Sequence, residues 1–295
     1  MLTLDRRHPD LEHIVGDDPV GERIAAGFGF TEGPLWRGSH LLFSDIPNSR
    51  IVRWEQKTEG PELTTFRTPS GNANGHTLDR QGRLVSCEHS ARRVSRTEAD
   101  GSVVTLADAF EGKRLNSPND VVVRNDGSLY FTDPPYGLPN LTEGKELDFH
   151  GVYRLDFDGS GPHLLVDDFD RPNGLAFSLD ESRLYVADTA RHHIRAFDVA
   201  ADGSISGGDV FAVLKGNDGE IGGPDGMKVD VEGNVYCTAR GGLWVVSEGG
   251  TVLGRIILPE QPANCGWGGS DWTTLYLTAR TGVYRVELQV AGIAV

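Results

Sequence analysis

The chain has 295 residues, a formal net charge of −15, 38 glycines and 15 prolines. The acidic balance argues against nucleic acid as a partner, because phosphate binding needs a basic surface. No apolar run approaches the roughly 18 residues of a membrane span, and residues 1–9 lack the apolar core of a signal peptide. We therefore expect a cytoplasmic protein that binds neither nucleic acid nor membranes, with monomer and small homo-oligomer both open.

The three cysteines show no spacing typical of zinc ligands. Cys87 and Cys237 lie inside apolar runs, and Cys265 directly follows Asn264, the first residue of one of the sequence repeats described next. We expect reduced, mostly buried thiols, as in a cytoplasmic protein.

A short polar signature opens an apolar stretch six times along the chain. The openers stand 39 to 54 residues apart, a spacing typical of propeller blades. Each opener begins an apolar run that leads through a hairpin turn into a return strand, as in residues 119–133. The six openers are Glu32-Gly33, Asn74-Gly75, Asn119-Asp120, Asn173-Gly174, Asp225-Gly226 and Asn264-Cys265.

Third and fourth strands follow in the repeats, for example residues 92–96 and 103–107. Six units of four strands predict an all-β fold, a six-bladed β-propeller in which residues 1–295 form one domain. The last repeat stops after its third strand, whereas residues 23–28 resemble a fourth strand ahead of the first opener. We expect this strand to complete the sixth blade beside residues 283–288, which leaves residues 1–21 as an N-terminal extension.

The openers should meet at one mouth of the central channel, because the innermost strands of a propeller line it. Glu32, Asn119, Asn173 and Asp225 then supply two carboxylates and two amides, all hard oxygen donors. We predict one divalent metal ion, with Ca²⁺ preferred and Mg²⁺, Mn²⁺ or Zn²⁺ as alternatives. Asn-Gly and Asp-Gly are also common turn dipeptides, but here they precede the strand and recur in register.

Four segments together resemble the senescence-marker/regucalcin and gluconolactonase family, and more distantly diisopropyl-fluorophosphatase and paraoxonase. The resemblance covers residues 22–290 and is most evident in segments 30–36, 116–120, 172–175 and 224–227. It implies a six-bladed propeller with one divalent metal bound at Glu32, Asn173 and Asp225. Asn119 is implied as a direct or water-mediated fourth contact, and Asp225 as general acid or base.

One position departs from the regucalcin pattern. Regucalcin-type members carry an arginine, which contacts sugar-lactone hydroxyls, two residues before the asparagine that matches Asn119. This chain has Ser117 there. The sequence therefore resembles the bacterial gluconolactonase-like branch, and the exact sugar stays open.

Opening a lactone requires a polarised carbonyl, a positioned water and a proton acceptor. A channel metal would supply the first two. Asp225 would accept the proton of the water and return it to the ring oxygen, and Asn119 would help to stabilise the oxyanion. The chain has no Gly-x-Ser-x-Gly nucleophile elbow, so nothing indicates a covalent route.

We therefore predict a metal-dependent hydrolase that opens small sugar lactones such as gluconolactone. Two alternatives remain. One is a promiscuous lactonase or organophosphate hydrolase, which would use the same metal ring with different pocket walls. The other is a non-enzymatic, metal-containing propeller that binds a ligand.

Further candidates lie near the predicted mouth. His76 is either a substrate contact or proton relay, or equally a structural histidine bonded to a neighbouring strand. Residues 134–150 connect the second and third strands of the third repeat, and this loop is longer than the equivalent loop of any other repeat. Tyr136 and His150 in it are predicted substrate contacts. Trp267 is a candidate contact for which a core position is favoured.

Second strands of the repeats often end in an acid, as at Asp133 and Asp188. These carboxylates either support the metal ligands or bond backbone turns. The second role is the favoured one.

Overall fold

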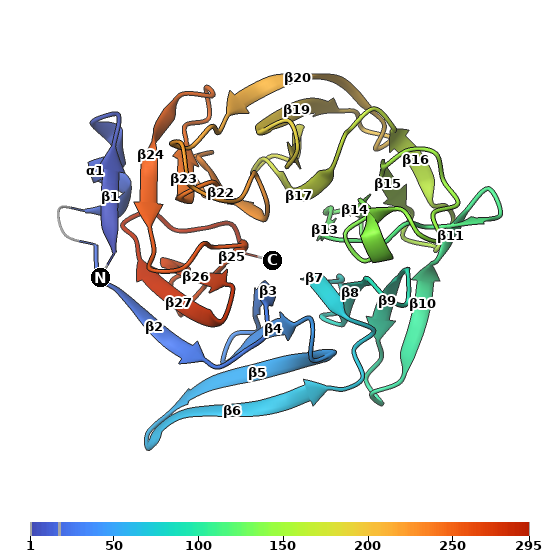
Figure 1. Ribbon diagram of the computed structural model, residues 1–295, viewed down its shortest axis with the longest axis horizontal. Helices are drawn as coiled ribbons and strands as arrows, with labels where there is room; N and C mark the ends of the chain where they lie inside the picture. The colour runs from blue at the N-terminus through green and yellow to red at the C-terminus, as the bar shows by residue number, and fades with distance from the viewer. Residues whose placement is uncertain (1, 17–18, 295) are drawn as a thin grey trace.

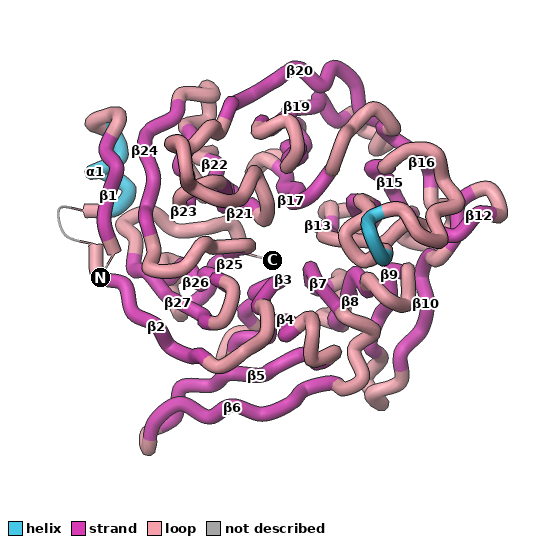
Figure 2. Tube along the Cα trace, in the orientation of Figure 1, coloured by secondary structure: helices cyan, strands magenta, loops and turns pink. Residues whose placement is uncertain are grey.

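The six repeats fold into six antiparallel sheets that surround one axis (Figure 1). The structure is a computed structural model that describes residues 2–16 and 19–294. β-Branched and aromatic residues form the strands, and Gly- and Asp-rich turns join them. The predicted six-bladed, almost all-β propeller is confirmed. Within the described residues, the helical segments are α1 (Asp10–Val15) and the 3₁₀ turn η1 (Pro139–Leu141) (Figure 2).

The first four blades are sheets of four consecutive strands. Blade 1 contains β3 (Thr31–Trp36), β4 (Leu41–Asp45), β5 (Arg50–Lys57) and β6 (Gly60–Arg67). Blade 2 contains β7 (Ala73–Leu78), β8 (Leu84–Glu88), β9 (Arg93–Thr97) and β10 (Val103–Ala107). Blade 3 contains β13 (Val121–Val123), β14 (Leu129–Asp133), β15 (Gly151–Leu155) and β16 (His163–Val166). Blade 4 contains β17 (Pro172–Phe177), β18 (Arg183–Asp188), β19 (His193–Val199) and β20 (Ile205–Val213).

The last two blades recruit strands from the N-terminus. Blade 5 contains β21 (Met227–Val229), β22 (Val235–Ala239), β23 (Gly242–Val246), β24 (Val252–Ile257) and, as a fifth strand, β1 (Thr3–Arg6). Blade 6 contains β25 (Asn264–Gly268), β26 (Thr274–Ala279), β27 (Gly282–Glu287) and β2 (Gly21–Ala26). A separate short hairpin, β11 (Ala109–Phe110) with β12 (Lys113–Arg114), precedes blade 3.

The predicted ring closure is confirmed. Strand β2 pairs antiparallel with β27, from Gly21 opposite Val286 to Ala26 opposite Gly282. The two ends of the chain are therefore joined in one sheet, in which β2 covers β27 and itself forms the outer edge of blade 6.

The structure of the N-terminal segment does not follow from the repeat pattern of the sequence. Leu11, Ile14 and Val15 of α1 are buried at 1% exposure or less, in the core cluster shared by blades 5 and 6. Each such side chain contributes about 1.5–3 kcal/mol when removed from water. The guanidinium of the buried Arg255 also pairs with Asp5 of β1 at 2.9 Å. This segment is therefore an integral part of the propeller.

Glycines of the openers let neighbouring blades approach closely at the axis. A Cβ atom on Gly33 would lie 2.1 Å from the carbonyl oxygen of Asn74, and one on Gly174 would lie 2.2 Å from that of Asp225. Atoms in close-packed interiors do not approach this far. A side chain at these positions would therefore push the innermost strands apart.

The C-terminal segment lies at the centre of the ring (Figure 1), beside the end of β21 that lies opposite the openers. The N–H of Ile293 donates to the carbonyl of Val229 at 3.2 Å, and Gly292 bridges to Asp230. A cavity of about 150 Å³ lies at this end of the channel. Most of its lining is apolar, including Trp36, Val121, Phe177, Trp267 and Ile293.

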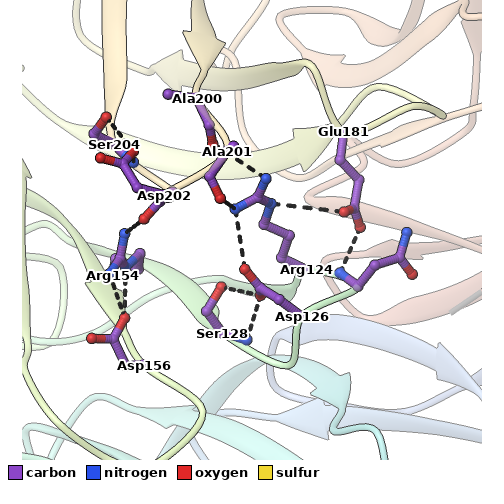
Figure 3. Close-up of polar contacts among 12 residues, drawn as sticks. Arg124, Asp126, Ser128, Arg154, Asp156, Glu181, Ala200, Ala201, Asp202 and Ser204 are labelled. Atoms are coloured by element: carbon purple, nitrogen blue, oxygen red, sulfur yellow. Dashed lines mark hydrogen bonds and ion pairs between the residues drawn. The ribbon is translucent and has the colours of Figure 1, made fainter.

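Turns at this far end tie blades 3 and 4 together (Figure 3). Arg124 donates to the carbonyls of Ala200 and Ala201 at 3.3 and 3.4 Å. Arg154 bonds the carbonyl of Asp202 in the same turn. The charged groups here are satisfied by neighbouring protein atoms.

Candidate metal and active site

The openers lie together at one end of the channel because the innermost strands all start there. The β3–β4 pairing shifts register directly after Glu32, and the β17–β18 pairing shifts directly after Pro172, at Asn173. Such bulges re-aim a side chain. Asn119 and Asp225 precede their strands, and their N–H groups donate to carbonyls of the second strand at 2.9 and 2.8 Å.

Two of the predicted metal ligands are carboxylates that repel each other. Glu32 is buried at 3% exposure and Asp225 is half-buried. Desolvation raises the pKa of Glu32 to about 7, and the Asp120 carboxylate adds to this, although the N–H of Gly33 donates to its Oε2 at 2.7 Å. Desolvation, then Glu32 and Asp120, raise the pKa of Asp225 well above its usual range. A cation bound between them would relieve this repulsion.

Asp120 is a third channel carboxylate, which was not among the predicted site residues. It is 2% exposed; its Oδ1 accepts from the N–H of Val121 at 2.9 Å, whereas its Oδ2 has no partner among the described residues. Four of the other five repeats have glycine at this position, and that break in the repeat could have identified it. Lys228 was missed too; desolvation raises the pKa of both Glu32 and Asp120, and the Lys228 ammonium opposes this rise.

Two amide side chains at this mouth are held by their nitrogen atoms, whereas Oδ1 of Asn264 accepts from the N–H of Cys265 at 2.8 Å. Nδ2 of Asn173 donates to Thr189 Oγ1 at 3.0 Å, and Thr189 donates to the carbonyl of Pro224 at 2.6 Å. Nδ2 of Asn74 bonds Nε2 of His89 at 3.0 Å, while its buried Oδ1 finds no partner in the described structure. The amide oxygens of Asn173 and Asn74 are therefore the atoms left to meet a ligand.

This donor set fits a hard divalent cation. It offers two carboxylates and two amides, and buried oxygens without partners lie nearby. Within residues 2–16 and 19–294, no group of three or more His, Cys, Asp or Glu side chains is arranged to hold a metal. Amide oxygens would therefore have to complete the coordination, which favours Ca²⁺ or Mg²⁺ over softer metals.

His76 is held between two serines. Its Nε2 lies 2.8 Å from Ser44 Oγ, and its Nδ1 lies 2.9 Å from Ser86 Oγ. Desolvation lowers the pKa of His76 to about 3. With both ring nitrogens bonded and the ring neutral, the geometry favours the structural alternative over a proton relay.

The acids at the ends of second strands bond backbone turns, as favoured. Asp133 accepts from the N–H groups of Asn116 and Ser117, both at 2.7 Å. Asp188 accepts from the N–H of Asp170 at 2.9 Å. These carboxylates fix the segments that lead into the first strand of their own blade, and no hydrogen bond among the described residues joins them to the side chain of an opener.

The structure places Tyr136 beside the predicted ligands. Desolvation, and then the Asp225 carboxylate, raise the pKa of Tyr136 to about 12, while the side chains of Thr189 and Asn173 oppose this shift. The phenol therefore lies among residues of blades 4 and 5 at the same mouth.

Two other candidate contacts make bonds elsewhere. Nδ1 of His150 bonds the carbonyl of Asp170, which ties the end of the long loop to blade 4. The indole of Trp267 is 3% exposed and donates to the carbonyl of Val229 at 3.0 Å. The favoured core position of Trp267 is confirmed. The three cysteines are buried and free, also as predicted.

Fold and site define a class of protein: a six-bladed propeller whose channel mouth gathers carboxylate and amide oxygens. Residues 30–281 match the family described as SMP-30/Gluconolactonase/LRE-like region, and this chain belongs to that family. The resemblance seen in the sequence is thereby confirmed. In addition, no helix in the described part of the chain is long and apolar enough to cross a membrane.

Individual relatives are similar over most of their length. A gluconolactonase from Zymomonas mobilis is 34% identical over 96% of this chain and 85% of the relative. A regucalcin from Oryctolagus cuniculus is 30% identical over 85% of this chain and 84% of the relative. The solved structure of a gluconolactonase from Xanthomonas campestris superposes with a TM-score of 0.87 at 34% identity, covering 97% of this chain and 94% of that one.

Proposed function

We propose that this chain is a metal-dependent hydrolase that opens small sugar lactones such as gluconolactone. The observation that carries the proposal is the gathering of Glu32, Asp120 and Asp225, with free amide oxygens, at one mouth of the channel. Membership of the gluconolactonase family, and the two gluconolactonases that resemble the whole chain, support the lactone as substrate class.

The predicted ligands have distinct roles in this proposal. Glu32, Asn173 and Asp225 would hold the ion, with Asn119 in direct or water-mediated contact. Ca²⁺ is preferred, with Mg²⁺, Mn²⁺ and Zn²⁺ as alternatives. When bound, the ion would polarise the lactone carbonyl as a Lewis acid. Asn119 is 5% exposed and its amide makes no hydrogen bond among the described residues, so it is free to donate to the developing oxyanion.

Asp225 would act as the general base. Its carboxylate would accept a proton from the attacking water and return that proton to the ring oxygen as the ring opens. Tyr136 and His150 are proposed substrate contacts on the 134–150 loop. His76 is bonded to two serines and is assigned no step, although the sequence also allowed it as a substrate contact.

A substrate panel tests the proposal against its alternatives. The purified protein would be assayed with each divalent ion on gluconolactone, a simple aliphatic lactone and a phosphotriester. We expect lactone opening that is lost with a chelator and restored by the ion. A higher kcat/KM for the phosphotriester would favour the organophosphate hydrolase. Stoichiometric ion binding without turnover of any substrate would favour the non-enzymatic propeller.

A further inference from the structure

The 134–150 loop carries a phenol whose hydroxyl is unsatisfied. The Tyr136 hydroxyl is buried close to Thr189 and Asn173, but it forms no well-aligned hydrogen bond with either side chain or with any other described residue. Its neighbours Thr189 and Asn173 are already bonded to each other, and Thr189 gives its own hydrogen to the carbonyl of Pro224. An unpartnered buried polar group costs about 1–3 kcal/mol. A ligand that supplied the missing partner would recover that free energy.

Ser117 fixes the turn from which Tyr136 projects. The Ser117 side chain is fully buried, its Oγ donates to the carbonyl of Pro134 at 2.7 Å, and it accepts from the N–H of Gly137 at 2.8 Å. A Cβ on Gly137 would lie only 2.6 Å from Cβ of His89. The turn is therefore clamped on both sides of Tyr136.

The rest of the loop is anchored as well. Arg92 donates to the carbonyl of Gly144 at 2.8 Å, and Nδ2 of Asn116 donates to that of Phe149 at 3.0 Å. Leu138 and Leu147 are buried. The loop therefore forms a fixed wall of the site, and Tyr136 is presented in a defined position.

We propose that Tyr136 hydrogen-bonds a ring hydroxyl of the substrate and makes the site selective for hydroxylated lactones over unsubstituted ones, with Ser117 as its positioning residue. This inference rests on the proposed function. A tyrosine hydroxyl both donates and accepts, which matches a sugar hydroxyl. A site built to bond a substrate hydroxyl discriminates against an analogue that lacks it, because its own polar group is then left unpaired.

Two lactones of the same ring size test the selectivity directly. Glucono-1,5-lactone carries ring hydroxyls, and δ-valerolactone carries none. Tyr136→Phe should lower kcat/KM for gluconolactone about 3- to 10-fold, mostly through KM, and leave δ-valerolactone nearly unchanged. Ser117→Ala should also lower the ratio of kcat/KM for gluconolactone to kcat/KM for δ-valerolactone. The double variant should be no worse than Tyr136→Phe alone, because Ser117 acts through Tyr136.

Tyr153→Phe is the matched control. The Tyr153 hydroxyl is also buried without a partner in the described structure, but its ring stacks on Phe131 in the core of blade 3, with centroids 5.2 Å apart. This variant should leave the ratio between the two lactones unchanged.

A binding measurement separates this inference from the proposed function. Titration calorimetry with gluconolactam, which resists hydrolysis, should show a Kd raised by Tyr136→Phe by the same factor as KM. Equal losses on both lactones, additive effects of the two substitutions, or an unchanged lactam Kd would overturn the inference. If the wild-type protein opens neither lactone, the proposed function fails, and the lactam titration alone decides the role of Tyr136.

Discussion

The two mouths of the channel are built from the same six innermost strands, yet they treat polar groups differently. At the opener mouth, Glu32 and Asp225 repel each other, and Asp120 holds a buried oxygen without a partner in the described structure. At the far mouth, Arg124 and Arg154 are bonded to carbonyls of the next blade, and the cavity lining is mainly apolar. One mouth is complete in itself, whereas the other, in our proposal, is completed by a bound cation. The following predictions test this contrast.

The largest effect should come from removing a metal ligand. Glu32→Ala should abolish ion binding and activity, because it removes one of two charged donors. The loss of affinity should exceed the roughly 10–100-fold typical of outer-shell changes. Elemental analysis and calorimetry with Ca²⁺ measure it. Glu181→Ala, at the far mouth, is the matched control and should keep the ion. Full ion content in Glu32→Ala would remove Glu32 from the site.

Asp225→Asn should separate ion binding from proton transfer. An amide can still offer an oxygen to the ion but cannot take a proton. We expect most of the ion to be retained and the rate to fall by about 10²–10⁴, the usual contribution of a positioned general base. Ion content and kcat are measured on the same sample. Near-normal turnover with the ion bound would mean that the base lies elsewhere.

His76 should influence stability in acid more than turnover. Desolvation lowers its pKa from the usual 6.5 to about 3 in the folded state. The unfolded chain therefore binds more protons between these values, and the free energy of unfolding falls as pH drops from about 6.5 toward 3. His76→Asn should flatten this dependence, by at most about 1.4 kcal/mol per pH unit. It should also cost about 1–3 kcal/mol at pH 7 through its lost hydrogen bonds.

Urea unfolding at a series of pH values measures the His76 effect, and kcat/KM at neutral pH provides the control. A large loss of turnover with unchanged acid stability would restore His76 as a proton relay.

The smallest effect should come from the far mouth. Arg124→Met removes hydrogen bonds to Ala200 and Ala201 and a contact with Asp126. We expect a loss of about 1 kcal/mol in the free energy of unfolding and no change in ion affinity or kcat/KM. A loss of activity with the fold intact would show that the two mouths are coupled.

The sequence predicted the repeats well because their signals are local. Alternating β-branched residues and Asp-Gly turns are read from neighbours in the chain. From them we predicted six blades and the pair of strands that closes the ring. The same signals predicted that one end of the channel carries Glu32, Asn119, Asn173 and Asp225. The resemblance to a family added the expected ligand roles, and the family itself is confirmed.

The remaining features depend on partners distant in sequence. His76 is a candidate contact in the sequence, and Ser44 and Ser86 become its partners only after blades 1 and 2 pack together. The role of Ser117 likewise appears only once the turn at Pro134 folds back on it.

The sequence by itself therefore determined the architecture and the chemical types gathered at the openers, because strand periodicity and turn residues act over a few positions. Tertiary structure decided which polar groups have hydrogen-bond or charged partners. It docked α1 on blades 5 and 6, brought Asp120 and Lys228 into the channel, and left the Tyr136 hydroxyl without a partner. Burial and pairing depend on contacts between distant segments, and these form only in the closed ring.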